Sequence, residues 1–110
     1  MKNTNLVAPV ANYIAAANAQ DIDAATANFS EAAVVRDEGQ DHTGMAAIQR
    51  WAVEVSRKYR PTVETLDVSQ ADGTTIVTGR VSGNFPGSPV DLRYRFRLER
   101  GLIASLEITA

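Results

Sequence analysis

The second half of the sequence alternates between apolar and polar residues with a period of two. From Thr62 onward, runs rich in β-branched and aromatic residues are separated by short turn sequences such as Asp72-Gly73. An Asp-Gly pair between two such runs is a strong hairpin signal, and the alternation gives each strand one inward face. The pattern therefore predicts four antiparallel strands that follow one another in a meander. Their expected ranges are residues 62–70, 74–85, 90–99 and 102–108.

The predicted strand at residues 90–99 has two very different faces. Alternation places Leu92, Tyr94 and Phe96 on one face, which we expect to be the concave, inward side. The charged residues fall on the convex face, where a solvated surface or a dimer interface explains them better than an anion or nucleic-acid site. These charged residues are Asp91, Arg93, Arg95, Arg97 and Glu99. In the last predicted strand, the residues expected to face inward are Leu102, Ala104, Leu106 and Ile108.

Apolar residues in the first half of the chain recur with helical spacing, which predicts three helices. The first covers residues 5–18. The second follows an Asp21 N-cap and carries Phe29 on its apolar face. The third starts from a Thr43 N-cap and ends before Pro61, because the residue that precedes a proline disfavours helical geometry.

Between the second and third helices the sequence predicts a short strand at residues 33–37 and a polar loop at residues 39–42. The order is therefore helix, helix, strand, helix and four strands, which indicates an α+β domain. We expect three N-terminal helices packed in a strongly curved, mainly antiparallel sheet. Such a sheet forms a cone with one pocket at its open end, and mouths of this kind are preferred ligand sites.

Length and composition exclude several classes of protein. A chain of 110 residues is expected to form a single domain over residues 1–110. The net charge of -2 argues against nucleic acid or an anionic membrane as a partner. The absence of cysteine excludes disulfides and thiolate metal sites. Neither a membrane-spanning apolar run nor a secretory leader is recognisable in the sequence, so we expect a cytoplasmic protein.

Asp37 ends the predicted strand at residues 33–37 and is the leading candidate for chemistry. Removal of a proton beside a carbonyl group needs a base and a donor for the developing oxyanion. Asp37 suits the base, with Tyr13 or Tyr94 as the donor. An apolar surrounding would raise the proton affinity of the carboxylate. The residues expected to supply it are Trp51, Val35 and Phe85.

The same residues also suit purely structural roles. Asp37 is equally expected to pair with Arg36, with His42 or with a backbone N–H. The aromatic candidates also suit simple packing in the core. His42 is the only histidine. One histidine beside Asp41 does not make a metal site, which normally needs three or more ligands, so we expect no metal. It suits a solvated loop position, or an acid–base or substrate-contacting role at the pocket rim.

The order of elements and the segments YIAAANAQDIDAATANFSEAAVVRDEG and TGMAAIQRW resemble the nuclear transport factor 2-like superfamily, in its SnoaL-like and ketosteroid isomerase-like branch. The resemblance covers the whole chain and implies this fold. It implies that Asp37 shuttles a proton and that Tyr13 donates to an oxyanion. The second acid that the isomerases use is missing here, because Leu92 and Tyr94 are the inward residues at its place. Ala52 replaces a supporting tyrosine on the third helix.

Two functions remain open on the sequence. The first is a small cofactor-independent isomerase or cyclase-like enzyme that acts on a hydrophobic carbonyl compound. The second is a non-catalytic domain of the same fold that binds a small ligand or assembles as a dimer. The resemblance favours a homodimer formed through the convex face of the sheet. No cofactor is implied by either function.

Overall fold

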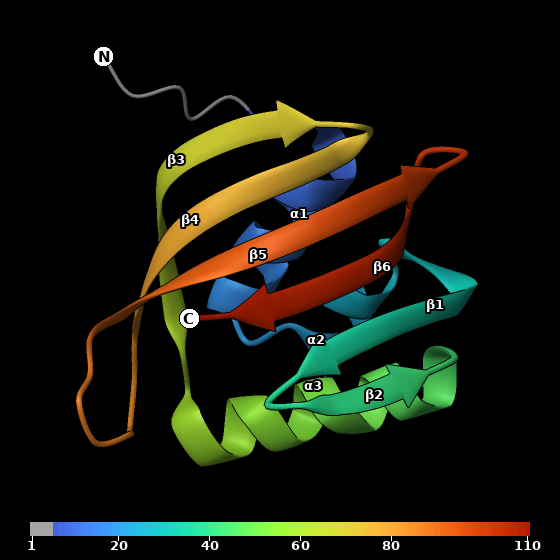
Figure 1. Ribbon diagram of the computed structural model, residues 1–110. Helices are drawn as coiled ribbons and strands as arrows, with labels where there is room; N and C mark the ends of the chain where they lie inside the picture. Colours follow the sequence, from blue (N-terminus) through green and yellow to red (C-terminus); the bar gives the residue numbers. More distant parts are fainter. Residues whose placement is uncertain (1–5) are drawn as a thin grey trace.

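The structure is a computed structural model and describes residues 6–110. The predicted start of the first helix at residue 5 lies outside the described residues. Three helices and one six-stranded sheet make up the fold (Figure 1). The helices are α1 (Ala8–Asn18), α2 (Ile22–Thr26) and α3 (Met45–Tyr59). The strands are β1 (Phe29–Asp37), β2 (Gln40–Thr43), β3 (Thr62–Ala71), β4 (Thr74–Ser82), β5 (Val90–Glu99) and β6 (Leu102–Thr109).

The strands lie in the order β2-β1-β6-β5-β4-β3. The last four strands therefore neighbour one another in chain order, which confirms the predicted meander. All pairs are antiparallel except β1 with β6, which is parallel. The sheet curves so that α1 and α2 lie behind it, and α3 runs along its β1–β2 end (Figure 1). The predicted α+β architecture with a curved, mainly antiparallel sheet is confirmed.

The predicted loop at residues 39–42 is wrong, because most of it is strand β2. Glu38 and Gly39 have φ angles of 53° and 75° and form a two-residue turn. Positive φ at both central positions matches the right-handed twist of a hairpin. Asp37 consequently pairs with Gln40, and β2 covers the edge of β1.

Strand β1 also begins earlier than predicted. Phe29, which the sequence placed on the second helix, is the first residue of β1 and pairs with Ile103 of β6. Thr43 was predicted to cap the third helix and instead ends β2. Gly44 occupies the N-cap of α3 with φ 87°. The predicted Asp21 cap is confirmed, since its Oδ1 accepts a hydrogen bond from Ala24 N at 3.2 Å.

The predicted inward face of the last strand is wrong at its start. Leu102 is 39% exposed, whereas Ile103 is fully buried. The pairing with β5 shifts between Arg97, which lies opposite Ser105, and Leu98, which lies opposite Ile103. Ala104 is therefore an extra residue in a β-bulge, and an extra residue reverses the alternation of faces. Beyond the bulge Leu106 faces inward and is 1% exposed, as predicted.

The side chain of Asn18 links the end of α1 to the start of β3. Its amide donates to Val63 O at 3.0 Å and accepts from Val63 N at 2.8 Å. The Asn18 side chain thus makes the two backbone hydrogen bonds that a neighbouring strand would otherwise make with Val63, which is partly buried. Because Tyr13 lies on the same helix, this two-way contact also fixes where the phenol enters the interior.

We predict that Asn18→Ala destabilises the fold by about 1–3 kcal/mol, since it leaves both polar groups of Val63 without their partner. Urea unfolding measures the loss. Asn12→Ala is the matched control, because Asn12 is exposed on the same helix and should change stability little. Equal stability of the two variants would contradict the assigned role of Asn18.

Candidate active site

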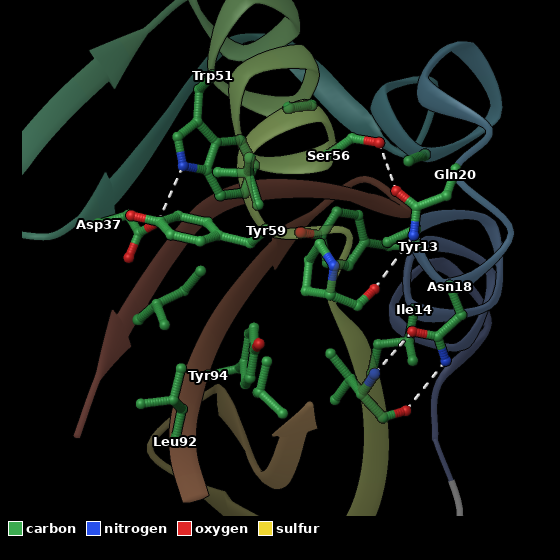
Figure 2. A pocket seen from close by; sticks show the side chains of 18 of the residues that line it. Tyr13, Ile14, Asn18, Gln20, Asp37, Trp51, Ser56, Tyr59, Leu92 and Tyr94 are labelled. Carbon is green, nitrogen blue, oxygen red and sulfur yellow. Dashed lines mark hydrogen bonds between the residues drawn. The ribbon is translucent and has the colours of Figure 1, made fainter. Parts of the chain in front are cut away.

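A cavity of about 270 Å³ opens between the helices and the concave side of the sheet. Its walls come from α1, α3 and strands β3 to β5, together with the end of β1 (Figure 2). Most of the lining side chains are apolar. Five residues that the sequence singled out as site candidates line this one space: Tyr13, Asp37, Trp51, Phe85 and Tyr94.

Asp37 presents its carboxylate to the cavity from the last position of β1. Trp51 Nε1 on α3 donates a hydrogen bond to Asp37 Oδ2 at 3.0 Å (Figure 2). Burial raises the pKa of Asp37, and the Trp51 hydrogen bond offsets only part of that effect. Arg36 does not pair with Asp37, because its guanidinium lies 3.6 Å from Asp41. A carboxylate held this way is a better proton acceptor than an exposed aspartate.

Two phenols share the cavity with Asp37. Tyr13 is 7% exposed and meets Phe29 edge-on at 5.4 Å, while Tyr94 is 6% exposed and stacks on Phe96 at 6.3 Å. Burial raises the pKa of both phenols, and the negative charge of Asp37 adds to the rise in each. Both hydroxyls therefore stay protonated at neutral pH.

The phenol hydroxyls are available to a ligand. Neither makes a hydrogen bond to another residue within residues 6–110, and no buried polar side-chain atom in that range lacks a partner. The hydroxyls of Tyr13 and Tyr94 therefore reach the open space of the cavity. The arrangement combines one proton acceptor with two hydrogen-bond donors in an apolar space.

Val35 and His42 lie apart from this group. Val35 is fully buried in the core and does not line the cavity. His42 lies on the other side of Trp51, with ring centroids 6.2 Å apart, and lines an outer groove. Phe85 lines the cavity and packs edge-on against Tyr59 at 5.9 Å.

Sequence reasoning missed four polar residues near the mouth of the cavity. Gln20 Nε2 donates to Pro61 O at 3.2 Å, and Gln20 Oε1 accepts a hydrogen bond from Ser56 Oγ (Figure 2). Tyr59 OH donates to Glu38 Oε1 at 3.2 Å. These contacts join residues 21 to 41 positions apart, so no local pattern in the sequence marks them.

Clustered metal ligands and membrane-spanning helices are both absent from residues 6–110. No group of three or more histidine, aspartate or glutamate side chains in this range is placed to hold a metal ion. No helix in the described part of the chain is long and apolar enough to cross a membrane.

The fold and cavity define a class of small α+β proteins whose curved sheet encloses a largely apolar site. Residues 10–106 match the family model of the SnoaL-like domain. The chain therefore belongs to the SnoaL-like family. A comparison with curated proteins gave no match.

Solved structures place the chain in the same group. A proposed polyketide cyclase from Sinorhizobium meliloti is 40% identical, with 92% of this chain and 93% of that chain covered and a TM-score of 0.88. SalBIII, an epoxide hydrolase/cyclase-like enzyme of pyran ring formation in salinomycin, is 22% identical, with 91% and 85% covered and a TM-score of 0.80. A protein of ketosteroid isomerase-like fold from Catenulispora acidiphila, in complex with trimethylamine, is 17% identical, with 96% and 87% covered and a TM-score of 0.83. At identities of 22% and 17%, the last two structures show only that the fold is shared.

The raised pKa of Asp37 predicts how stability depends on pH. The folded state binds the Asp37 proton more readily than the unfolded chain does, so the ionised carboxylate opposes folding at about pH 7. That cost disappears as the pH falls through the folded pKa and below the ordinary aspartate value of about 4. Asparagine does not ionise and still offers Trp51 an oxygen.

We therefore expect Asp37→Asn to be more stable than the unchanged protein at about pH 7, and we expect the difference to shrink as the pH is lowered towards about 4. Urea unfolding across this pH range measures it. Asp67→Asn, an exposed aspartate on β3, serves as the control and should show no such trend. A less stable Asp37→Asn variant at neutral pH would contradict the assigned environment of the carboxylate.

Proposed function

We propose that this protein is a cofactor-independent isomerase or cyclase-like catalyst that removes a proton beside the carbonyl group of a small hydrophobic compound. One observation carries the proposal. Asp37, whose pKa is raised by burial, lies in the same apolar cavity as two protonated phenols whose hydroxyls bond to no other residue in the described range 6–110. These are the groups that enolisation of a ketone requires.

Each group has a distinct part in the proposed reaction. Asp37 takes the proton from the carbon next to the carbonyl group, and the electron pair of that C–H bond moves into the enolate. Tyr13 or Tyr94 donates a hydrogen bond to the oxygen on which negative charge develops. With a β,γ-unsaturated ketone the enolate is a dienolate, and return of the proton from Asp37 to its far carbon gives the conjugated isomer. With a second carbonyl group in the same molecule, attack of the enolate carbon on that group closes a ring, and the alkoxide that forms takes the proton from Asp37.

In this proposal Tyr94 takes the place of the missing second acid. The resemblance to the isomerases implied a protonated acid as the second oxyanion donor, and the sequence lacks it. Tyr94 lines the cavity from β5 and is protonated, so a phenol supplies a second donor in this proposal. The polyketide cyclase proposed for the 40% identical relative supports the same reaction class, since ring closure of a polyketone also begins with an enolate.

The test uses 2-tetralone, a bicyclic apolar ketone with acidic protons at C1. In D2O we expect the protein to accelerate deuterium exchange at C1. Proton NMR measures the rate of this exchange. Asp37→Asn should lower the protein-dependent rate by about 100-fold or more, because general-base catalysis contributes about 10²–10⁴-fold. Tyr13→Phe should lower the rate by a smaller factor, since Tyr94 remains as a donor. Asp67→Asn should exchange at the unchanged rate.

The same experiment separates the two functions that the sequence left open. If the protein binds 2-tetralone but leaves the exchange rate at its value in buffer, the non-catalytic binding domain is favoured. If exchange is accelerated equally by Asp37→Asn, Asp37 is not the base.

We also propose a homodimer formed through the convex face of the sheet. This face carries both signs of charge, including Arg93, Arg95 and Arg97 on β5 and Glu107 on β6, and Arg95 lies opposite Glu107 in the β5–β6 pairing. A face with both signs can complement its own two-fold copy. Sedimentation velocity should give twice the 11.9 kDa chain mass, and Arg97→Glu should shift the species towards the monomer. A monomer at high protein concentration would refute this assembly.

A further inference from the structure

The apolar cavity lies next to a second, polar space. A groove of about 340 Å³ lies on the far side of Trp51, between the β1–β2 hairpin and α3. Because the two spaces share several lining residues, they are neighbours divided by these side chains, and a ligand that occupies both must displace part of this boundary. The shared residues are Asp37, Glu38, Trp51, Val55 and Tyr59.

Two hydrogen bonds mark the boundary between cavity and groove. The inner one is the bond from Trp51 Nε1 to Asp37. The outer one runs from Tyr59 OH, at the end of α3, to Glu38 Oε1 at 3.2 Å and is exposed to solvent. An exposed neutral-to-charged hydrogen bond adds little net stability, because water replaces either partner. A ligand that extends past Tyr59 therefore displaces this bond at small cost.

The inner cavity has few polar groups to offer a ligand apart from Asp37 and the phenols. Both atoms of the Asn18 amide are used by Val63. Gln20 and Ser56 bond to each other, and the Gln20 amide also donates to Pro61 O. The cavity thus suits an apolar ring system with a single carbonyl group.

The groove has the opposite character. Arg50, Glu54 and Lys58 follow one another at four-residue spacing on α3, so they lie along one helical face. Gln40 and His42 face them from β2. Within residues 6–110 none of the three charged α3 side chains forms an ion pair. Donors and acceptors therefore alternate along the groove. Lys58 Nζ lies over the ring of Tyr59, 5.1 Å from its centroid, and the ammonium group is not held in an ion pair by any residue in the described range.

We propose that the groove is a second subsite, which binds an uncharged, hydroxyl- or carbonyl-bearing arm of the ligand whose ring occupies the cavity. The assignment rests on the proposed function for the position of the ring. Both signs of charge line the groove, so a carboxylate arm or an ammonium arm meets repelling groups as well as attracting ones, whereas a neutral arm is repelled by none. The anionic residues are Asp37, Glu38 and Glu54, and the cationic residues are Arg50 and Lys58. A hydroxylated arm both donates to Glu54 and accepts from Lys58.

Binding of four ring compounds tests the proposal without turnover. They are 2-tetralone and its derivatives carrying a dihydroxypropyl, a carboxymethyl or an aminoethyl ether on the aromatic ring. Dissociation constants come from calorimetry, and amide chemical shifts report the space occupied. We expect the dihydroxypropyl compound to bind about tenfold more tightly than 2-tetralone, as one or two net hydrogen bonds would give. We expect it to shift groove signals at His42 and Lys58 that 2-tetralone leaves unchanged.

The paired variant Glu54→Ala/Lys58→Ala should abolish the tenfold gain and leave the affinity for 2-tetralone unchanged. Both residues are exposed and alanine favours helices, so the fold is retained. Arg57→Ala is the matched control, since Arg57 is an exposed cation on α3 that lines neither space, and it should keep the gain.

Three results would overturn the inference: no gain from the neutral arm, a gain that survives the paired variant, or tighter binding of either charged arm. These results are independent of the deuterium exchange experiment. A protein that shows the gain but no Asp37-dependent exchange would retain the subsite and lose the proposed catalysis. A protein that exchanges deuterium but shows no gain would retain the catalysis and lose the subsite.

Discussion

The indole of Trp51 donates a hydrogen bond to the carboxylate of Asp37, and this contact joins α3 to the end of β1. The indole also forms the wall between the apolar cavity and the polar groove. A partly buried carboxylate needs a hydrogen-bond partner, because burial of an unpaired charge is costly. Here the partner is a neutral donor and not a cation, so the carboxylate is satisfied but its pKa stays raised. Trp51 thus helps to position the carboxylate of Asp37, while burial is the main cause of its raised pKa.

Packing in the rest of the fold offsets the destabilising effect of the ionised Asp37 carboxylate. Phe96, Ile48, Ile103 and Val35 are completely or almost completely buried and come from four different elements. Their packing holds the sheet curved over the helices, so the side chains that line the cavity do not collapse into it. A carboxylate that opposes folding at neutral pH is typical of a site kept for function at some cost in stability.

The cavity and the groove offer two environments within reach of the same carboxylate. The cavity walls are apolar, and their amide side chains are already paired with neighbouring residues. The groove walls carry charges of both signs along α3, and none of these α3 charges forms an ion pair within residues 6–110. A ligand with an apolar ring and a neutral polar arm matches both environments at once. Such a division lets the protein recognise a molecule by its arm while the chemistry takes place at its ring.

Local patterns in the sequence determined much of the fold. The alternation after Thr62 predicted the meander, because side chains alternate between the two faces of a strand with a period of two. The sequence also indicated Asp37, at the end of a short strand, as a candidate base with Tyr13 or Tyr94 as the donor. All three residues line the cavity.

Tertiary contacts decided the remainder. A single extra residue at Ala104 reversed the inward face of β6, and such a bulge depends on the pairing with β5. Strand β2 exists because a Glu38-Gly39 turn lets polar residues pair with β1, although their sequence looks like a loop. The groove beside Trp51 arises only where that hairpin meets α3. Sequence patterns carry the period of each element, whereas bulges, edge strands and the spaces between elements depend on residues that are distant in the chain.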